Sequence, residues 1–307
     1  MKIKKAERSK IKVPIMLMGA SGAGKTLSAL LIAKGIVESM FPDMVEAQQW
    51  EKVGMIETEH NRSSLYVNTE HDGATIGQFL QIELEPPFTA DRYEEAFKLF
   101  KDNHVEVIIV DSLSSVWSGE GGILDKVNQF GGSIGDWKKV SPDQKKVLHM
   151  LTDSDVHVIA TVRSKQGVEV TRSDTGKVQV EKVGLKPDQK DGLEYEFAIT
   201  FQIYQNHIAQ AMKDNSSIFD TAIQLDRNVG HKIYAWAEQG VDINVQRKVK
   251  AQAAFLKLVS DRPDLAEAAE QLKNQIGKKD LSEWTFDELK NGYKHLMAWS
   301  KKEKQEA

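Results

Sequence analysis

The stretch "GASGAGKT", Gly19 to Thr26, decides how the rest of the chain is interpreted. It fits the pattern G-x-x-x-x-G-K-[ST] at every fixed position, which is the pattern of a phosphate-binding loop. Residues 13–18 before it are apolar and predict a short strand, and residues 27–40 after it carry apolar residues at helical spacing. Because the motif needs a strand before it and a helix after it, the sequence predicts a nucleotide site here.

The chemistry of this loop predicts a role for each of its residues. Glycines allow the backbone N–H groups to close around phosphate oxygens, and the helix N-terminus adds positive potential. We expect the Lys25 ammonium to act in catalysis on the β- and γ-phosphates and the Thr26 hydroxyl to hold Mg²⁺. The residues predicted to bind nucleotide are Gly19, Ala20, Ser21, Gly22, Ala23, Gly24, Lys25 and Thr26.

A carboxylate at the end of another apolar stretch completes the predicted metal site. Asp111 ends "VEVIIVD", residues 105–111, which is apolar enough for a strand that is buried on both faces. Beside a phosphate-binding loop such an acid holds Mg²⁺, commonly through water. Without the loop, a solvated aspartate at a strand end would be the simpler interpretation. The sequence therefore predicts ATP and Mg²⁺ as cofactors.

Composition limits the class of protein. Hydrophobic residues make up 40% and charged residues 28% of the 307 residues, as in ordinary soluble globular proteins. The absence of cysteine excludes disulfides and thiolate metal sites. No apolar run approaches the roughly 20 residues of a membrane span, and the basic N-terminus lacks the apolar segment of a secretory signal. We expect a cytoplasmic protein without a membrane partner, and its net charge of −4 gives no support for nucleic-acid binding.

The pattern of elements predicts the fold class. Further strands are expected at 53–57 and 156–162, and helices at 89–103 and 141–154. Strands that alternate with helices predict an α/β fold with a mainly parallel sheet flanked by helices. After Arg163, "GVEVTRSDTGKVQVEKVG" is typical of a β-hairpin and "EFAITFQIYQNHIAQAM" of two antiparallel strands. We expect a core at 1–245 and a small helical C-terminal module at 246–307.

Two carboxylates follow the strand predicted at 53–57. ATP hydrolysis needs a carboxylate that orients or deprotonates the attacking water, and a strand beside that of the phosphate-binding loop can position one. Glu57 and Glu59 differ by two positions, so they point to the same side if the strand continues that far. One of them would be the base and the other a structural partner.

The segment "MIETEHNRSSLY", residues 55–66, resembles the segment after the second core strand of RecA-like recombinases. The resemblance implies a RecA-like ATPase core in which Glu59 is the catalytic glutamate, His60 its neighbour and Tyr66 the ring that stacks on adenine. It also implies that Thr161 occupies a nucleotide-sensing position where many recombinases have glutamine.

More narrowly, residues 10–230 resemble phage-encoded RecA-like ATPases that act as single-strand annealing proteins. The resemblance is carried by "VDSLSSVWSGEGGILDKV", "HVIATVRSK" and "GLKPDQKDGLEYEF". It implies single-stranded DNA as a partner, a ring or filament of identical copies, and the cytoplasm of a bacterial host. Lys213 would then reach the γ-phosphate across a subunit interface, although "KDNSS" also suits an exposed turn.

Local charge offers a DNA surface within this resemblance. Residues 163–190 carry a net charge of +3, which suits phosphate contacts along a single strand, although a solvated hairpin is the plain alternative. The residues predicted to bind DNA are Arg163, Lys165, Arg172, Lys177 and Lys182. Residues 246–307 also carry +3, and their aromatic residues at helical spacing suit either the core of a small module or a surface for a single-strand-binding or other recombination protein.

The sequence thus predicts an ATP-binding and ATP-hydrolysing RecA-like protein that acts on single-stranded DNA in phage recombination or strand annealing. Two alternatives remain open at this point. The first is a DNA-stimulated motor or helicase-loader-type ATPase in phage replication, which would separate strands. The second is a non-catalytic module in which ATP sets only the oligomeric state.

Overall fold

A computed structural model of the chain describes residues 5–71, 73–172 and 178–306, without the side chains of residues 165–185 and 300–306. The chain divides into two compact units, one formed by Ile11–Ala237 and the other by Met1–Lys10 together with Glu238–Ala307. Residue 245, the predicted boundary, lies in the first turn of helix α8 (Ile243–Asp261). The larger unit contains the phosphate-binding loop.

In the described part of this larger unit, nine strands form one sheet in the order β11-β10-β9-β1-β7-β6-β2-β5, with β8 paired to β7. The strands β1, β2, β5, β6, β7 and β9 run parallel, whereas β10, β11 and β8 are antiparallel to their neighbours. The bounds of the strands are β1 (Pro14–Gly19), β2 (Val53–Glu57), β5 (Leu80–Glu83), β6 (Val107–Asp111), β7 (His157–Arg172), β8 (Val178–Pro187), β9 (Ile199–Ile203), β10 (Ile208–Asp214) and β11 (Ile223–Gln224), and a separate ladder joins β3 (Glu70–His71) to β4 (Ala74–Thr75).

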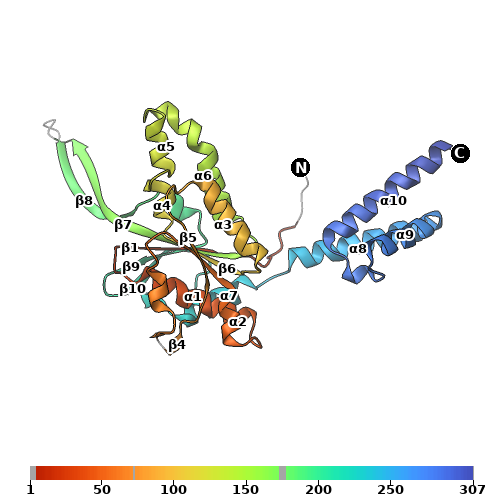
Figure 1. Ribbon diagram of the computed structural model, residues 1–307, viewed down its shortest axis with the longest axis horizontal. Coiled ribbons are helices and arrows are strands. Elements are labelled where there is room, and N and C mark those ends of the chain that lie inside the picture. Colours follow the sequence, from red (N-terminus) through yellow and green to blue (C-terminus); the bar gives the residue numbers. More distant parts are fainter. Residues whose placement is uncertain (1–4, 72, 173–177, 307) are drawn as a thin grey trace. The chain divides into compact units, whose positions relative to one another are not determined.

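Helices cover both faces of the sheet (Figure 1). One layer consists of α1 (Lys25–Met40), α2 (Glu46–Trp50) and α7 (Arg227–Ala237), and the other of α3 (Ala90–Asp102), α4 (Ser114–Ser118), α5 (Ile123–Gln129) and α6 (Trp137–Thr152). Successive residues of a central strand enter opposite layers, so Ile109 packs with the α1 layer while Ile108 and Val110 pack with the other. The predicted α/β fold with a mainly parallel sheet flanked by helices is confirmed.

The helix that follows the phosphate-binding loop is held by close packing. A Cβ atom at Gly35 of α1 would lie 2.0 Å from the Arg227 carbonyl oxygen, and one at Gly230 of α7 would lie 2.2 Å from the Ile32 carbonyl oxygen. Only glycine at both positions allows the two helix backbones to approach this closely. This contact fixes α1, and with it the end of the helix that faces the loop.

Two predicted elements differ from those observed. The strand expected at 156–162 does not end before the hairpin, because β7 continues through Arg163 to Arg172 and pairs there with β8. The helix expected at 141–154 begins earlier, at Trp137, because Ser133 and Asp136 form a capping box on the preceding 3-10 turn Ile134–Asp136. Pro142 therefore lies inside α6 rather than at its first turn.

The smaller unit is helical and has its own apolar core. It contains α8 (Ile243–Asp261), α9 (Ala266–Ile276) and α10 (Phe286–Glu306). Phe255 and Trp284 meet there edge to face with ring centroids 5.5 Å apart, and Leu289 and Leu296 are fully buried beside them. Within the described residues of the whole chain, no helix combines the length and the apolar character that crossing a membrane would require.

Candidate active site

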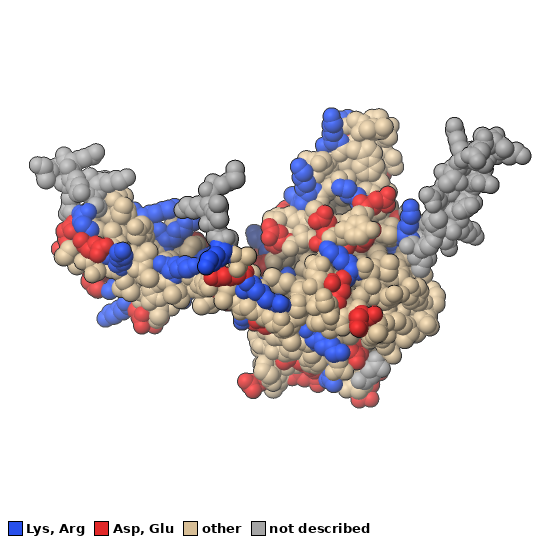
Figure 2. All heavy atoms as spheres, turned by 180° about the vertical axis from the view of Figure 1, so that it is seen from behind, with Lys and Arg blue, Asp and Glu red and all other residues tan. Residues whose placement is uncertain are grey.

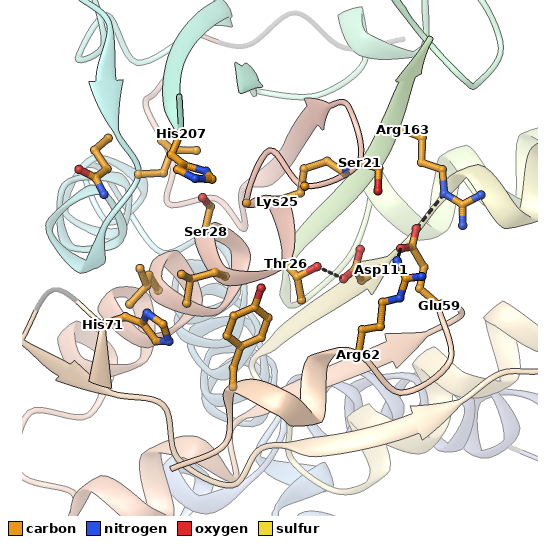
Figure 3. A pocket seen from close by; sticks show the side chains of 17 residues that line it. Ser21, Lys25, Thr26, Ser28, Glu59, Arg62, His71, Asp111, Arg163 and His207 are labelled. Atoms are coloured by element: carbon orange, nitrogen blue, oxygen red, sulfur yellow. Dashed lines mark hydrogen bonds and ion pairs between the residues drawn. The ribbon is translucent and has the colours of Figure 1, made fainter. Parts of the chain in front are cut away.

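A pocket of about 400 Å³ opens at the carboxyl end of β1 (Figure 3). Its walls are the phosphate-binding loop, the chain from Glu59 to His71, Asp111 at the end of β6, Arg163 on β7, and residues of the β9–β10 turn and β11. Ligands of open α/β sheets bind at the carboxyl ends of the strands. The pocket therefore lies where the fold and the motif both place a nucleotide.

The phosphate-binding loop joins β1 to α1 through two glycines in the left-handed region, Gly22 with φ 80° and Gly24 with φ 94°. A Cβ atom at Gly24 would also lie 3.1 Å from Nδ1 of His207. Both residues therefore need to be glycine. The first N–H groups of α1 have no partner within the helix and are free to donate to an anion bound by the loop.

Lys25 lies folded against its own loop. Its Nζ donates to the carbonyl oxygens of Gly19 at 3.0 Å and Ala20 at 2.9 Å, and the residue is 8% exposed. Burial lowers the pKa of the Lys25 ammonium, and the carboxylates of Asp111 and Glu59 partly offset this effect. The ammonium has three N–H donors. These donors can turn from the two loop carbonyl oxygens to phosphate oxygens when a nucleotide binds in the loop.

Helix α1 and two strands, β6 and β7, meet at the predicted metal ligands. The Thr26 hydroxyl donates to Oδ2 of Asp111 at 2.6 Å, and the Thr161 hydroxyl donates to Oδ1. Thr161 can do so because β7 lies between β1 and β6. Burial raises the pKa of the Asp111 carboxyl to about 6, although the hydrogen bonds from Thr161 and Thr26 act in the opposite direction. Thr161 is fully buried and does not line the pocket, and its predicted nucleotide-sensing role stays a prediction.

These oxygens fit Mg²⁺. A hydroxyl and a carboxylate are hard ligands, and Mg²⁺ is usually held by one or two protein oxygens together with phosphates and water. Within the described residues there is no group of three or more His, Cys, Asp or Glu side chains that could enclose an ion. Thr26 and Asp111 would therefore hold an ion whose remaining ligands come from the nucleotide and solvent.

The two predicted carboxylates have separate roles. The strand β2 ends at Glu57, which is 2% exposed, and its carboxylate accepts hydrogen bonds from the backbone N–H groups of Glu59 at 2.6 Å and Ser63 at 3.1 Å. Glu57 therefore shapes the loop, and Glu59 enters the pocket from that loop. The two side chains were expected to point to the same side only if the strand continued to Glu59, and this condition is not met because β2 ends at Glu57. The expectation that this strand neighbours β1 is wrong, because β7 and β6 lie between them.

Glu59 is held by an arginine from β7. Its Oε1 accepts a hydrogen bond from Nε of Arg163 at 2.8 Å, and its Oε2 lies 3.7 Å from Nη1 of Arg62 (Figure 3). Arg163 pairs in register with Gly19, so it sits beside the first residue of the phosphate-binding loop. Arg163 was predicted to bind DNA, but in the structure it donates a hydrogen bond to Glu59, the carboxylate predicted to act in hydrolysis. The sequence contained a signal for this, since the predicted strand 156–162 ends one residue before Arg163 at the same edge of the sheet.

The other end of the pocket is more apolar. Leu27, Leu31 and Leu225 line it together with Tyr66, which ends the 3-10 turn Ser63–Tyr66. Burial, and then the Asp111 carboxylate, raises the pKa of the Tyr66 phenol. The Tyr66 ring lies within the pocket wall, and its stacking on adenine stays a prediction.

The residues of the pocket wall that were not predicted from the sequence include His71, His207 and Gln224. The turn between β9 and β10 forms two hydrogen bonds with the phosphate-binding loop. Nδ1 of His207 donates to the Ala23 carbonyl oxygen at 3.1 Å, and Nε2 of Gln205 donates to the Ser21 carbonyl oxygen at 3.2 Å. These residues come from a turn and from two very short strands, which show no periodicity that a sequence pattern could detect.

Three of the other predicted DNA-binding residues lie on the hairpin of β7 and β8: Lys165 and Arg172 on β7, and Lys182 on β8. The backbone pairing from Ser164–Pro187 to Arg172–Val178 confirms the hairpin itself. The side chains of Lys165, Arg172 and Lys182 and the whole of Lys177 lie outside the described residues. On the face of the larger unit seen in Figure 2, Lys and Arg side chains alternate with Asp and Glu, so surface charge there does not mark a nucleic-acid site.

Lys213 lies away from the pocket of its own chain. It pairs with Thr200 near the start of β9, whereas Ile203 at the other end of β9 pairs with Gly19. Its Nζ donates to the Tyr195 carbonyl oxygen. Any contact of Lys213 with a γ-phosphate would therefore involve a neighbouring copy.

Comparison with known families agrees with this site. The sequence pattern of a family described as an AAA domain matches residues 11–239. The chain belongs to the AAA-domain family. The matched residues include the phosphate-binding loop, both glutamates, Asp111 and the whole hairpin, and they mark this AAA-domain protein as a P-loop ATPase that binds nucleotide. A search among curated proteins finds no match to the chain.

Proposed function

We propose that this AAA-domain protein hydrolyses Mg-ATP and acts on single-stranded DNA in recombination or strand annealing. The observation that carries the proposal is the continuity of β7. This strand holds Arg163 against Glu59 in the pocket and then continues into the hairpin, which extends away from the sheet (Figure 1). An element suited to contact a second ligand thus shares one strand with the site of hydrolysis.

The roles of the residues follow from their positions. Glu59 orients the attacking water and accepts its proton, since its carboxylate lies in the pocket beside Lys25 and Asp111. Lys25 and the N–H groups of the loop stabilise the charge that develops on the phosphate oxygens. Bound Mg²⁺ would neutralise part of the charge of these oxygens. Arg163 sets the position of the Glu59 carboxylate.

The resemblance to phage-encoded annealing proteins supports single-stranded DNA as the second ligand and a host cytoplasm as its setting. In this proposal the hairpin contacts the DNA backbone. A displacement of the hairpin on DNA binding shifts Arg163, and through Arg163 the Glu59 carboxylate. Copies of the chain assemble on the strand as a ring or filament, and Lys213 of one copy acts on the γ-phosphate bound by the next.

Charge reversal in the hairpin tests the DNA contact. The double variant Lys177→Glu/Lys182→Glu is expected to weaken binding of an oligothymidylate and to lower the slope of log K against log salt. Each lost contact with single-stranded DNA removes a slope of about 0.7, so two contacts remove about 1.4. Fluorescence anisotropy at several salt concentrations measures both quantities.

A matched variant controls for net charge. Lys98 and Lys145 are exposed on α3 and α6 of the same unit, so Lys98→Glu/Lys145→Glu changes the charge equally away from the hairpin. It should keep the affinity and slope of the wild type. If the hairpin variant also overlays the wild type at every salt concentration, the hairpin does not bind DNA.

A further inference from the structure

We propose that His71 selects adenine over 6-oxopurine bases by accepting a hydrogen bond from the adenine amino group. This rests on the proposed use of ATP and adds the residue that determines the base. The phosphate-binding loop fixes one end of the nucleotide, so the base occupies the end lined by Leu27, Leu31 and Leu225. Figure 3 shows His71 at this end, across the pocket from Glu59 and Arg163.

The position of His71 is fixed by a short ladder. His71 pairs with Ala74, and the Ile76 N–H donates to the Thr69 carbonyl oxygen at 3.0 Å. Ala74 is 3% exposed and Ile76 is fully buried, so this ladder is anchored in the core beneath α1. The His71 ring also meets the Tyr66 ring edge to face, with centroids 5.7 Å apart. The imidazole is therefore held in one place rather than free to turn.

The hydrogen bonds of Thr69 assign the tautomer of His71. The Thr69 hydroxyl lies 2.5 Å from the Tyr66 carbonyl oxygen and 3.0 Å from Nε2 of His71. A carbonyl oxygen only accepts, so the single hydroxyl proton goes to Tyr66. The hydroxyl must then accept from Nε2, which carries the proton of the neutral ring. Nδ1 is left as an acceptor, and no described residue donates to it.

An acceptor at this place distinguishes the two kinds of purine. The amino group of adenine donates to Nδ1, whereas the 6-oxo group of hypoxanthine or guanine brings a lone pair against the lone pair of Nδ1. Gln224, which also lines the pocket, does not discriminate, because its amide can both donate and accept. The choice of base therefore rests on the fixed tautomer of His71, and Thr69 is the residue that positions its proton.

Nucleotide binding without DNA and without hydrolysis tests this assignment. Calorimetric titrations with Mg²⁺ would compare ADP, inosine diphosphate and purine riboside diphosphate, which lacks the amino group. The wild type is expected to bind ADP about tenfold more tightly than purine riboside diphosphate, which corresponds to about 1.4 kcal/mol, and inosine diphosphate more weakly still. Gln224→Ala, the control, should lower all three affinities in similar proportion.

Two variants separate the hydrogen bond from a packing role. His71→Phe keeps a ring beside Tyr66 and should bind the three nucleotides with affinities within about threefold of one another. Thr69→Val removes the hydroxyl that accepts from Nε2 of His71. The proton can then reside on Nδ1, which can donate to a 6-oxo group. This variant should therefore bind inosine diphosphate more tightly than the wild type does. A residue that only packs the pocket would instead lower all affinities together.

The outcomes are distinguishable. Equal affinities for ADP and inosine diphosphate in the wild type, or selectivity that survives in His71→Phe, would overturn the role of His71 and leave the ATPase proposal standing. Absence of ADP binding to the wild type would overturn the nucleotide site and this assignment with it.

Discussion

Replacing Lys25 with alanine is expected to abolish ATP hydrolysis by the folded protein. Among the described residues, the Lys25 side chain donates to the carbonyl oxygens of Gly19 and Ala20 in its own loop, and nucleotide phosphates are the anions that such a loop binds. Loss of one donor to developing charge typically costs about 10²–10³-fold in rate, and loss of a full cation beside the γ-phosphate should cost at least that. Phosphate release and ADP titration would measure the loss.

The fold should survive this change. Burial already disfavours the charged form of Lys25, so removal of the ammonium takes away an unfavourable desolvation as well as two hydrogen bonds. The melting temperature is expected to stay within a few degrees of the wild-type value. Lys12→Ala is the matched control. Lys12 precedes the amino-terminal end of β1, whereas the loop follows its carboxyl-terminal end, and Lys12 forms an ion pair with Glu106. If the folded Lys25→Ala protein hydrolysed ATP at the wild-type rate, the phosphate-binding loop would not be the site of hydrolysis.

Glu59→Gln is expected to bind ATP with near-wild-type affinity and to hydrolyse it about 10²–10⁴-fold more slowly. A glutamine can still contact Arg163, but it cannot take a proton from water, and a positioned base typically contributes a factor of this size. Single-turnover hydrolysis with bound ATP separates the chemical step from binding. The variant should therefore trap ATP in the pocket.

Glu57→Gln is the informative comparison, because Glu57 is buried and accepts hydrogen bonds from the backbone N–H groups of Glu59 and Ser63. An amide in its place turns one acceptor into a donor that faces an N–H group, which loosens the loop and lowers the rate less than Glu59→Gln does. A larger loss of the chemical step in Glu57→Gln than in Glu59→Gln would mean that the base has been assigned to the wrong glutamate.

Local sequence was sufficient to predict the main elements of the fold. The strand predicted at 53–57 coincides with β2, and Asp111 ends β6 at the edge of the sheet where the phosphate-binding loop lies. These predictions succeeded because a buried parallel strand is a continuous apolar run, and because the loop motif requires a strand and a helix around it. The contact between Thr26 and Asp111 also depends on the order of the strands, because α1 follows β1 and Asp111 ends β6, and β7 lies between these two strands.

The contacts of Glu59 could not be predicted in the same way. Spacing suggested that Glu57 and Glu59 would share one side if the strand continued to Glu59, but β2 pairs with β6 only as far as Glu57 and Asp111. The order of strands in the sheet is also a non-local property. It brings Arg163 of β7 to Glu59 across a separation of 104 residues.

The base-binding end of the pocket shows the same limit. His71 lies on a two-residue strand and Gln224 on another, and such elements are too short to show a period of two. The tautomer of His71 depends on a hydroxyl two residues away and on the carbonyl oxygen to which that hydroxyl donates. Sequence can suggest residue types for such a site, but it does not show which hydrogen-bonding atoms remain available to a ligand.

The most direct test of the coupled function is the steady-state rate of ATP hydrolysis with and without single-stranded DNA, at one fixed salt concentration and with Lys25→Ala as the blank. The strand that positions Arg163 on Glu59 also forms the hairpin, so DNA on the hairpin should change the rate at the pocket. Hydrolysis is expected to depend on Mg²⁺ and to rise several-fold when an oligothymidylate is bound. An identical rate in both conditions, with DNA binding demonstrated in the same samples, would contradict this expectation.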